Sequence, residues 1–313
     1  MPNPTPLHRP VLYQEIINAL NPQSGGRYVD GTLGAGGHSY GILNASTPDG
    51  QLLGFDLDPQ AISLARATLA PFEGRFHLVH DSYLTLHQHM RSLGWQAVDG
   101  IVLDFGVSSM QLDQPQRGFS FLREGPLDMR FDPTRGVSAA EFLEHTTESE
   151  LADILWRYGE EPKSRRLAAA ILARRPITTT TQLAAIIEEA IGRRPIRGRT
   201  HIHPATRSFQ ALRIAVNEEL RAVESIIPLA IEALAPGGYL AVISFHSLED
   251  RIVKNSFRRE STDCICPPEQ PVCTCGHTAS IRLTPRKAVM ASEQEVAQNP
   301  RSRSAKLRIA QKI

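Results

Sequence analysis

Short apolar runs alternate with amphipathic stretches over much of the chain. The β-rich runs lie at residues 27–30, 52–56, 76–80, 100–104 and 239–244, and helical patterns lie at 38–45, 59–69 and 217–234. The second of these helices is well marked, because Asp58 stands at its N-cap and Pro59 at its first helical position. Strands that alternate with helices form a mostly parallel sheet. The pattern therefore predicts an α/β, Rossmann-like fold.

The alternation stops after the fourth predicted strand. Residues 111–213 show helical and loop patterns without a convincing strand, and the sheet pattern resumes at 239. We therefore predict a sheet domain of residues 1–110 and 214–313 and an inserted all-helical domain of residues 111–213. Near the end of the chain, residues 282–290 and 305–310 are predicted to pair as a hairpin that closes one edge of the sheet.

The composition is that of an ordinary globular protein. Hydrophobic residues make up 41% of the 313 positions and charged residues 21%, and no apolar run approaches the roughly 18 residues of a membrane span. The first ten residues are rich in proline and lack the apolar centre of a secretory signal. We therefore expect a cytoplasmic protein with no membrane partner.

The net charge of +1 hides two opposed blocks. Residues 99–161 carry 13 acidic and 5 basic side chains, whereas residues 162–213 carry 11 basic and 2 acidic ones, a local net charge of +9. Residues 301–313 add five basic side chains and no acid. Such clusters are either solvated faces or contacts to a phosphate backbone. The candidate phosphate contacts are Lys163, Arg165, Arg166, His201, His203, Arg207 and Arg213.

A glycine-rich loop follows the first predicted strand. Residues 30–38 read DGTLGAGGH, and glycines let a backbone approach a ligand closely. In a doubly wound sheet this first turn lies at the edge where ligands bind. A dinucleotide fingerprint would need a third glycine where Ser39 stands, so a pyrophosphate ligand is disfavoured.

Three further residues follow predicted strands and suit a nucleoside-bearing cofactor. Asp56 can accept hydrogen bonds from both hydroxyls of a ribose, and Tyr83 offers an aromatic face to an adenine ring. Asp104 can hold an ammonium group at the cofactor's amino-acid end. A nucleoside cofactor with an amino-acid end can carry a sulfonium, which donates a methyl group. Such a transfer is governed chiefly by positioning, so the lack of a recognisable catalytic triad does not argue against an enzyme.

Several long strings resemble the bacterial 16S ribosomal RNA cytosine-N4 methyltransferase family, historically called MraW. They read HRPVL at 8–12, the loop at 30–38, LDFGVSSMQLD at 103–113, RGFSF at 117–121, GPLDMR at 125–130, HPATR at 203–207, FQALR at 209–213, SFHSLEDR at 244–251 and NPRSRS at 299–304.

The resemblance implies a class I methyltransferase sheet with an inserted helical domain and S-adenosylmethionine as cofactor. It also implies that the enzyme methylates the N4 amine of a cytidine in the decoding region of small-subunit (16S) RNA, so that its partner is this RNA or the small ribosomal subunit. The implied cofactor contacts are Gly36, Gly37, His38, Asp56, Tyr83, Asp104 and Gln111.

An exocyclic amine is a poor nucleophile and benefits from a group that accepts its proton. Many amino-group methyltransferases carry an Asp/Asn/Ser-Pro-Pro-aromatic string after the fourth strand, whereas this chain has DFGV at 104–107. The candidate acceptors are therefore Asp104 and, after the fifth strand, His246. His246 is equally consistent with a residue that only begins a helix.

The tract 117–135 is either a loop that shapes the cytosine pocket or a packed loop, and Arg130 is expected to form an internal ion pair with Asp128. The four cysteines, Cys264, Cys266, Cys273 and Cys275, suit a structural zinc site that catalysis would not need. Four reduced cysteines in a surface loop are the alternative.

Two other classes of function share some of these features. A nicotinamide-dependent oxidoreductase would also use the sheet and Asp56, but should show the full dinucleotide glycine pattern. A non-catalytic RNA-binding protein would keep the basic block, but has no need of Asp56 together with the glycine loop.

Overall fold

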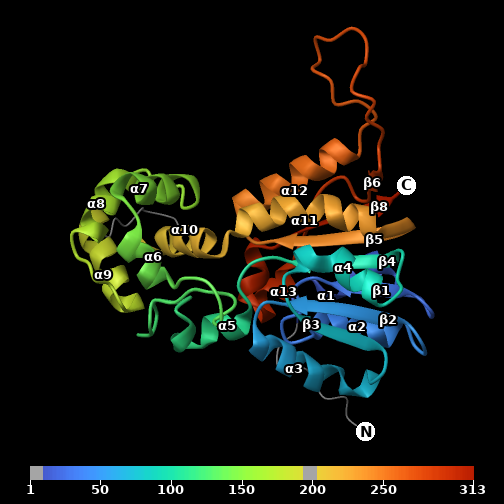
Figure 1. Cartoon of the computed structure of the whole chain (residues 1–313), viewed down its shortest axis with the longest axis horizontal. Helices are drawn as coiled ribbons and strands as arrows, with labels where there is room; N and C mark the ends of the chain where they lie inside the picture. Colours follow the sequence, from blue (N-terminus) through green and yellow to red (C-terminus); the bar gives the residue numbers. More distant parts are fainter. Residues whose placement is uncertain (1–9, 193–202) are drawn as a thin grey trace. The chain divides into compact units, whose positions relative to one another are not determined.

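A computed structural model describes residues 10–192 and 203–313. The chain divides into two compact units, unit 1 formed by Met1–Gly106 and Leu220–Ile313 and unit 2 formed by Val107–Glu219 (Figure 1). His8 and Arg9 of the first family string lie outside the described residues. So do His201 and four arginines of the basic block, at 193, 194, 197 and 199.

Unit 1 is built on one eight-stranded sheet. Its strands are β1 (Arg27–Asp30), β2 (Gln51–Asp56), β3 (Phe76–His80), β4 (Val98–Asp104), β5 (Leu234–Ser244), β6 (Ile281–Leu283), β7 (Val289–Met290) and β8 (Lys306–Lys312). They follow the order β3-β2-β1-β4-β5-β8-β6, and β7 pairs with β8. The first five strands are parallel, and β8 runs antiparallel to β5. The predicted parallel sheet is confirmed.

The predicted pairing of residues 282–290 with 305–310 at one edge of the sheet is confirmed, but the first segment is divided. Residues 282–290 do not make one strand, because β6 and β7 are separate short strands that both pair with β8. β8 lies between β5 and β6 inside the sheet. Its Leu307, Ile309 and Ala310 are all buried, as expected for a strand with neighbours on both sides. Pro285, between β6 and β7, has no N–H to donate to a ladder.

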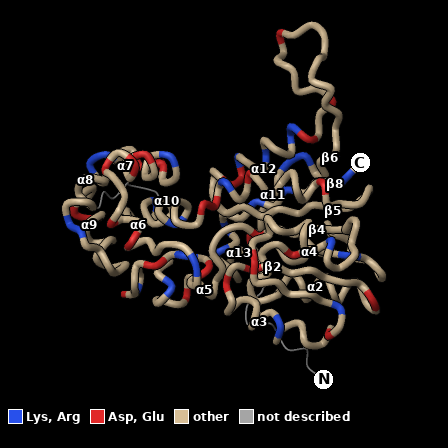
Figure 2. The backbone as a smooth tube through the Cα atoms, in the orientation of Figure 1, with Lys and Arg blue, Asp and Glu red and all other residues tan. Residues whose placement is uncertain are grey.

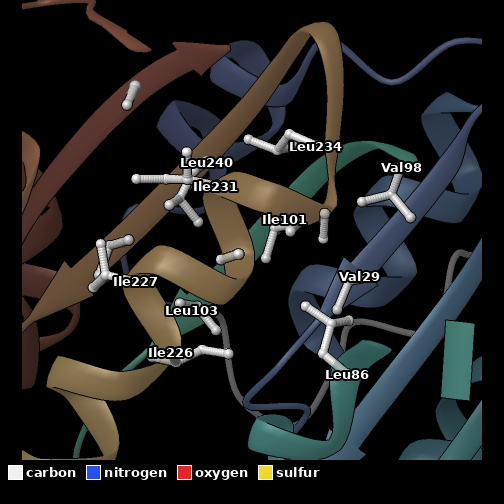
Figure 3. Close-up of a cluster of buried hydrophobic side chains, with 14 of the residues drawn as sticks. Val29, Leu86, Val98, Ile101, Leu103, Ile226, Ile227, Ile231, Leu234 and Leu240 are labelled. Atoms are coloured by element: carbon white, nitrogen blue, oxygen red, sulfur yellow. The ribbon is translucent and has the colours of Figure 1, made fainter. Parts of the chain in front are cut away.

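Helices cover both faces of the sheet. The unit 1 helices are α1 (Tyr13–Leu20), α2 (Gly37–Ala45), α3 (Pro59–Leu69), α4 (Leu86–Ser92), α11 (Glu219–Ala233), α12 (Ser247–Glu260) and α13 (Glu293–Gln298). Successive strand residues point to opposite faces. Ile101 and Leu103 of β4 accordingly pack in one buried cluster with α4, α11 and α12 (Figure 3), whereas Val102 packs in another with α1 and α2.

The described residues of unit 2 form helices and loops, with one isolated bridge between Pro126 and Thr179. Its helices are α5 (Ser109–Asp113), α6 (Ala139–His145), α7 (Glu148–Arg157), α8 (Ser164–Leu172), α9 (Thr180–Ile191) and α10 (Ala205–Asn217). They enclose their own buried apolar cluster. Over the described parts of both units, no helix is long and apolar enough to cross a bilayer.

Candidate active site

The first strand ends before its two neighbours do. Asp30, the last residue of β1, pairs with Gly54 of β2 and Val102 of β4. The neighbouring strands continue past this level and end at Asp56 and Asp104. In a doubly wound sheet the switch point lies between β1 and β4, at their carboxyl ends. Two carboxylates therefore flank the end of β1 where a ligand is expected.

The loop that leaves β1 is tied to both flanking strands. The N–H of Gly31 donates to Val102 O at 3.0 Å, and the N–H of Leu33 donates to Phe55 O at 2.9 Å. Thr32 Oγ1 then accepts from the N–H of Asp104 at 2.6 Å, and Asp56 Oδ2 accepts from the N–H of Gly34 at 2.8 Å. Loop and carboxylates thus form one hydrogen-bonded assembly.

Gly36 and Gly37 lie where this loop enters α2. Gly36 has φ +83°, and a Cβ built on it would lie 3.2 Å from both Cα and Cβ of Ala65 in α3. A Cβ on Gly37 would lie 2.3 Å from Cγ of Pro10. The left-handed backbone and the close neighbours account for glycine at these positions. No side chain caps α2, so its first N–H groups form a positive end that suits a carboxylate.

Asp30 holds the start of α2 through a hydrogen bond from Ser39. The sequence alone assigned no role to this residue. Its Oδ2 accepts from Ser39 Oγ at 2.6 Å, and its Oδ1 accepts from the N–H of Thr32 at 3.1 Å. Burial raises the pKa of Asp30. Ser39 stands where the third glycine of a dinucleotide-binding motif would be. Its side chain is buried and donates a hydrogen bond to Asp30. The position of this aspartate directly before the glycine loop is the feature of the sequence that could have indicated its role.

His38 and Asp104 place buried polar atoms side by side. His38 Nε2 lies 3.6 Å from Asp104 Oδ2, and only 7% of the His38 side chain is exposed. Both ring nitrogens of His38 and Oδ1 of Asp104 are buried without a hydrogen-bond partner in the described structure. Leaving such atoms unpaired costs about 1–3 kcal/mol each. A ligand that bonds to them would remove this cost, so these residues fit a polar cofactor.

Asp56 accepts two backbone hydrogen bonds at the start of α3. Its Oδ1 accepts from the N–H of Asp58 at 2.8 Å, in addition to the bond from Gly34. Burial outweighs these bonds and raises the pKa of Asp56 to about 6. The N-cap role is confirmed for Asp58, whose side chain accepts from the N–H of Gln60 at 3.0 Å. Asp56 is therefore not needed as the cap, and its remaining lone pairs suit hydroxyl groups.

The other two predicted cofactor contacts lie in different units. Tyr83 opens a short 3-10 helix, Tyr83–Thr85, and its ring centroid lies 6.3 Å from that of Phe105. A Cβ built on Gly31 would lie 3.3 Å from Tyr83 Cβ, so Tyr83 borders the glycine loop. Gln111 belongs to α5 of unit 2 and forms a capping box with Ser108. Its contact to a cofactor stays a prediction.

His246 stands at the N-cap of α12. Its Nδ1 accepts from the N–H of Glu249 at 3.4 Å, while Glu249 Oε2 accepts from the N–H groups of Phe245 and His246. This reciprocal capping box accounts for a histidine that begins a helix. The catalytic role of His246 stays a prediction, and so does that of Asp104, which adjoins the glycine loop.

The predicted phosphate contacts of unit 2 differ in their exposure. Arg213 forms a two-point ion pair with Glu219, at 2.7 and 2.9 Å, and only 16% of its side chain is exposed. Lys163 donates from Nζ to Ile191 O at 3.0 Å. Arg207 is exposed and donates to Glu160 O. Arg165 and Arg166 lie exposed on α8. Figure 2 colours the basic positions of the described residues blue. Among the candidate phosphate contacts that the structure describes, the exposed ones are therefore Arg165, Arg166 and Arg207.

The tract 117–135 packs within unit 2. Phe119, Leu127 and Met129 are buried in its apolar cluster, and Arg117 donates to Arg130 O and Phe131 O. The expected ion pair of Arg130 with Asp128 is confirmed, at 2.7 and 2.8 Å. The tract thus has an internal structural role, and its part in a cytosine pocket stays a prediction.

Fold and site together define a class of protein. Five parallel strands in the order β3-β2-β1-β4-β5, completed by antiparallel β8, with a glycine loop and carboxylates at the switch point, form a Rossmann-like methyltransferase. The chain belongs to the MraW methylase family, whose model matches residues 5–313. Membership in a methylase family decides against a nicotinamide-dependent oxidoreductase and against a non-catalytic RNA-binding protein.

Relatives of known name span nearly the whole chain. It is 51% identical over 309 residues to "Ribosomal RNA small subunit methyltransferase H" of Thermomicrobium roseum, covering 98% of this chain and 94% of that protein. The protein of the same name from Citrifermentans bemidjiense is 51% identical over 309 residues, covering 98% of each chain. Among solved structures, an rRNA methylase from Streptococcus thermophilus superposes with a TM-score of 0.41 at 10% identity, over 96% of this chain and 93% of that chain.

Proposed function

We propose that this protein transfers a methyl group from S-adenosylmethionine to the N4 amine of a cytidine in the decoding region of small-subunit (16S) ribosomal RNA. The observation that carries the proposal is the glycine loop bonded to Asp56 and Asp104, with unpartnered buried atoms on His38 and Asp104 beside it. Membership in the MraW family and relatives named as small-subunit methyltransferases support the substrate class.

The residues of unit 1 would hold the cofactor by complementary charge and shape. Asp56 would accept bonds from the two ribose hydroxyls, and Tyr83 would border the adenine ring. Gly36 and Gly37 would allow the backbone to approach the ligand, while His38 and Asp104 would bind its amino-acid end. When bound, S-adenosylmethionine supplies an electrophilic methyl group on a positively charged sulfur. Carboxylates at this edge suit that charge.

Asp104 would also act on the acceptor. The N4 lone pair of cytosine is drawn into the ring, so the amine becomes a better nucleophile when a carboxylate accepts one of its hydrogens. Oδ1 of Asp104 is buried without a partner and is available for this bond. The proton that N4 loses would pass through Asp104 toward solvent. The cytidine must leave its stack to bring N4 to the cofactor.

Unit 2 would supply the binding surface for the RNA. The exposed Arg165, Arg166 and Arg207 lie in a block of residues with a net charge of +9, and such clusters bind phosphate backbones. A partner of this kind would be either the free RNA or the assembled small subunit.

Tritium transfer tests the proposal directly. The purified protein is incubated with [methyl-³H]S-adenosylmethionine and small subunits from a strain that lacks the endogenous enzyme, and the labelled nucleoside is mapped. We expect label on N4 of one cytidine in the decoding region. Label on carbon 5 or on a ribose oxygen would refute the proposed chemistry. Label on N4 of a cytidine elsewhere would refute the site. No label on subunits or on free 16S RNA would refute the substrate class.

A further inference from the structure

All four cysteines of the chain gather in one loop that the methyl-transfer chemistry does not use. The loop, residues 261–280, joins α12 to β6 and projects away from the sheet of unit 1 (Figure 1). Three of the cysteines are exposed and Cys266 is half-buried. Burial in an apolar core therefore does not explain why four thiols lie together here.

The four cysteine sulfur atoms lie close together. Cys264 Sγ is 3.5 Å from Cys273 Sγ and 3.9 Å from Cys275 Sγ. Cys273 Sγ is 3.6 Å from Cys275 Sγ and 4.0 Å from Cys266 Sγ, and all four sulfurs lie within 4.8 Å of one another. Four thiolates bound tetrahedrally at about 2.3 Å from a zinc ion stand about 3.8 Å apart. The spacing of the sulfurs therefore matches a four-thiolate zinc site.

Backbone N–H groups surround the sulfurs as a second layer. Cys275 Sγ accepts from the N–H groups of Ile265 and His277, each at 3.5 Å, and Cys264 Sγ accepts from the N–H of Cys266 at 3.5 Å. Bonds of this kind stabilise thiolates and orient metal ligands. His277, the other conceivable ligand, is engaged elsewhere, because its Nε2 lies 2.9 Å from Arg259 O.

The base of the loop holds the two Cys-x-Cys segments opposite each other. The N–H of Ser280 donates to Glu260 O at 2.8 Å, and the N–H of Ala279 donates to Asp263 Oδ1 at 3.2 Å. These bonds pair the two arms of the loop just before the first cysteine and just after the last. The sulfurs are therefore brought together by the fold of the arms.

We infer that Cys264, Cys266, Cys273 and Cys275 bind one zinc ion as thiolates and that this ion orders the loop between α12 and β6. Four protein ligands fill a tetrahedral zinc ion and leave no position for water or substrate. The site is therefore structural. The zinc ion would stabilise this loop and would take no part in methyl transfer.

The test uses the full chain, produced with zinc in the medium and purified without chelator. Metal analysis should find about one zinc ion per chain, and replacement by Co²⁺ should give the intense visible bands of a tetrahedral thiolate complex. Cys273→Ser together with Cys275→Ser should abolish both signals. Two matched controls, Thr274→Ser between those cysteines and His277→Gln, should keep them.

Proteolysis reports on the ordering of the loop. Removal of zinc from the wild-type chain should expose the segment 261–280 to cleavage, whereas S-adenosylhomocysteine binding at the sheet edge should be unchanged. The inference would be overturned if the protein, as first purified from zinc-containing medium, held no metal and four titratable thiols. Two disulfides detected by mass spectrometry would overturn it as well. Loss of the metal from His277→Gln would overturn the four-thiolate ligand set.

Discussion

Four carboxylates, two in each unit, differ in how their charge is compensated. In unit 1, Asp56 and Asp104 gather at one sheet edge, and Asp104 keeps a buried oxygen without a partner. In unit 2, Asp128 and Glu219 are each matched by an arginine in a two-point ion pair. All four of these carboxylates are partly or fully buried. Of the four, only Asp128 and Glu219 are neutralised by an arginine of the chain.

The difference separates charges that hold the fold from charges that await a ligand. A buried carboxylate is costly unless a partner compensates it. Arg130 and Arg213 provide that compensation in unit 2, so their removal should destabilise the protein. At the edge of unit 1 the compensation would come from a cationic, hydroxyl-rich cofactor, so changes there should affect binding and turnover more than stability.

The largest effect is expected for Asp104→Ala. Removing the carboxylate takes away the proposed proton acceptor, and general bases contribute about 10²- to 10⁴-fold to rate. We expect the single-turnover rate of tritium transfer to fall by that factor, with the melting temperature nearly unchanged. Asp153→Asn, which alters an exposed carboxylate on α7, is the control. A rate within threefold of wild type would remove Asp104 from the mechanism.

Arg213→Ala should give the largest loss of stability. It removes the two-point partner of Glu219, whose side chain is 5% exposed, and breaking a buried pair costs about 3 kcal/mol. Urea unfolding of the full chain measures this change. Arg157→Ala breaks an exposed pair with Asp153 and should cost less than about 1 kcal/mol. Equal costs for the two variants would contradict the structural role assigned to Arg213.

Asp56→Asn should weaken cofactor binding rather than unfold the protein. Hydrogen bonds to a charged group contribute about 1.5–3 kcal/mol, so calorimetry should show the Kd for S-adenosylhomocysteine rising roughly 10- to 100-fold. An unchanged Kd would exclude Asp56 from the ribose site.

The same carboxyl predicts a pH dependence. Burial raises the pKa of Asp56 from 3.8 to about 6, so the unliganded protein takes up a proton as the pH falls through 6. The neutral group is a weaker acceptor, and the Kd should rise by up to about tenfold per pH unit below this point. The folding stability of the free protein depends on pH in the opposite direction. The raised pKa contributes stability below 3.8 that is lost as the pH rises through about 6. Asp56→Asn should remove both trends.

Gly36→Ala and Gly74→Ala form a matched pair, because both glycines have φ +83°. Each substitution should cost about 1–2 kcal/mol of stability, since alanine is strained in this region. Only at Gly36 would the new methyl group meet Ala65, whereas nothing lies within 4 Å at Gly74. Cofactor affinity should therefore fall in Gly36→Ala alone. A similar fall in both variants would indicate a general loss of stability.

Arg207→Ala should produce the smallest effect. The side chain is exposed, so stability should change by less than about 0.5 kcal/mol. Loss of one phosphate contact should lower the slope of log K against log salt by about 0.7–0.9. Filter binding of 16S RNA at several salt concentrations measures the slope. An unchanged slope would argue against unit 2 as the RNA surface at this position.

Local signals in the sequence were enough to locate most elements and the cofactor loop. Short apolar, β-rich runs marked the five parallel strands, and Asp58 with Pro59 marked the start of α3. The predicted helix at 217–234 corresponds to α11, which ends at Ala233, and β5 begins at Leu234 rather than 239. The early part of β5 was missed because its pairing with Val98 passes through an irregular register before Gly100, and Pro and Gly in this stretch weaken a strand pattern.

What the sequence determined by itself is short in range: strand and helix periods, caps, and a glycine loop followed by strand-end carboxylates. Only the tertiary structure decided which side chains meet across long separations. It bonded Thr32 to Asp104, set β8 inside the sheet and paired Arg213 with Glu219 instead of leaving it exposed. Capping and periodicity act between neighbours in the chain, whereas strand order, register and ion-pair choice depend on how distant segments pack. A single sequence carries no direct record of that packing.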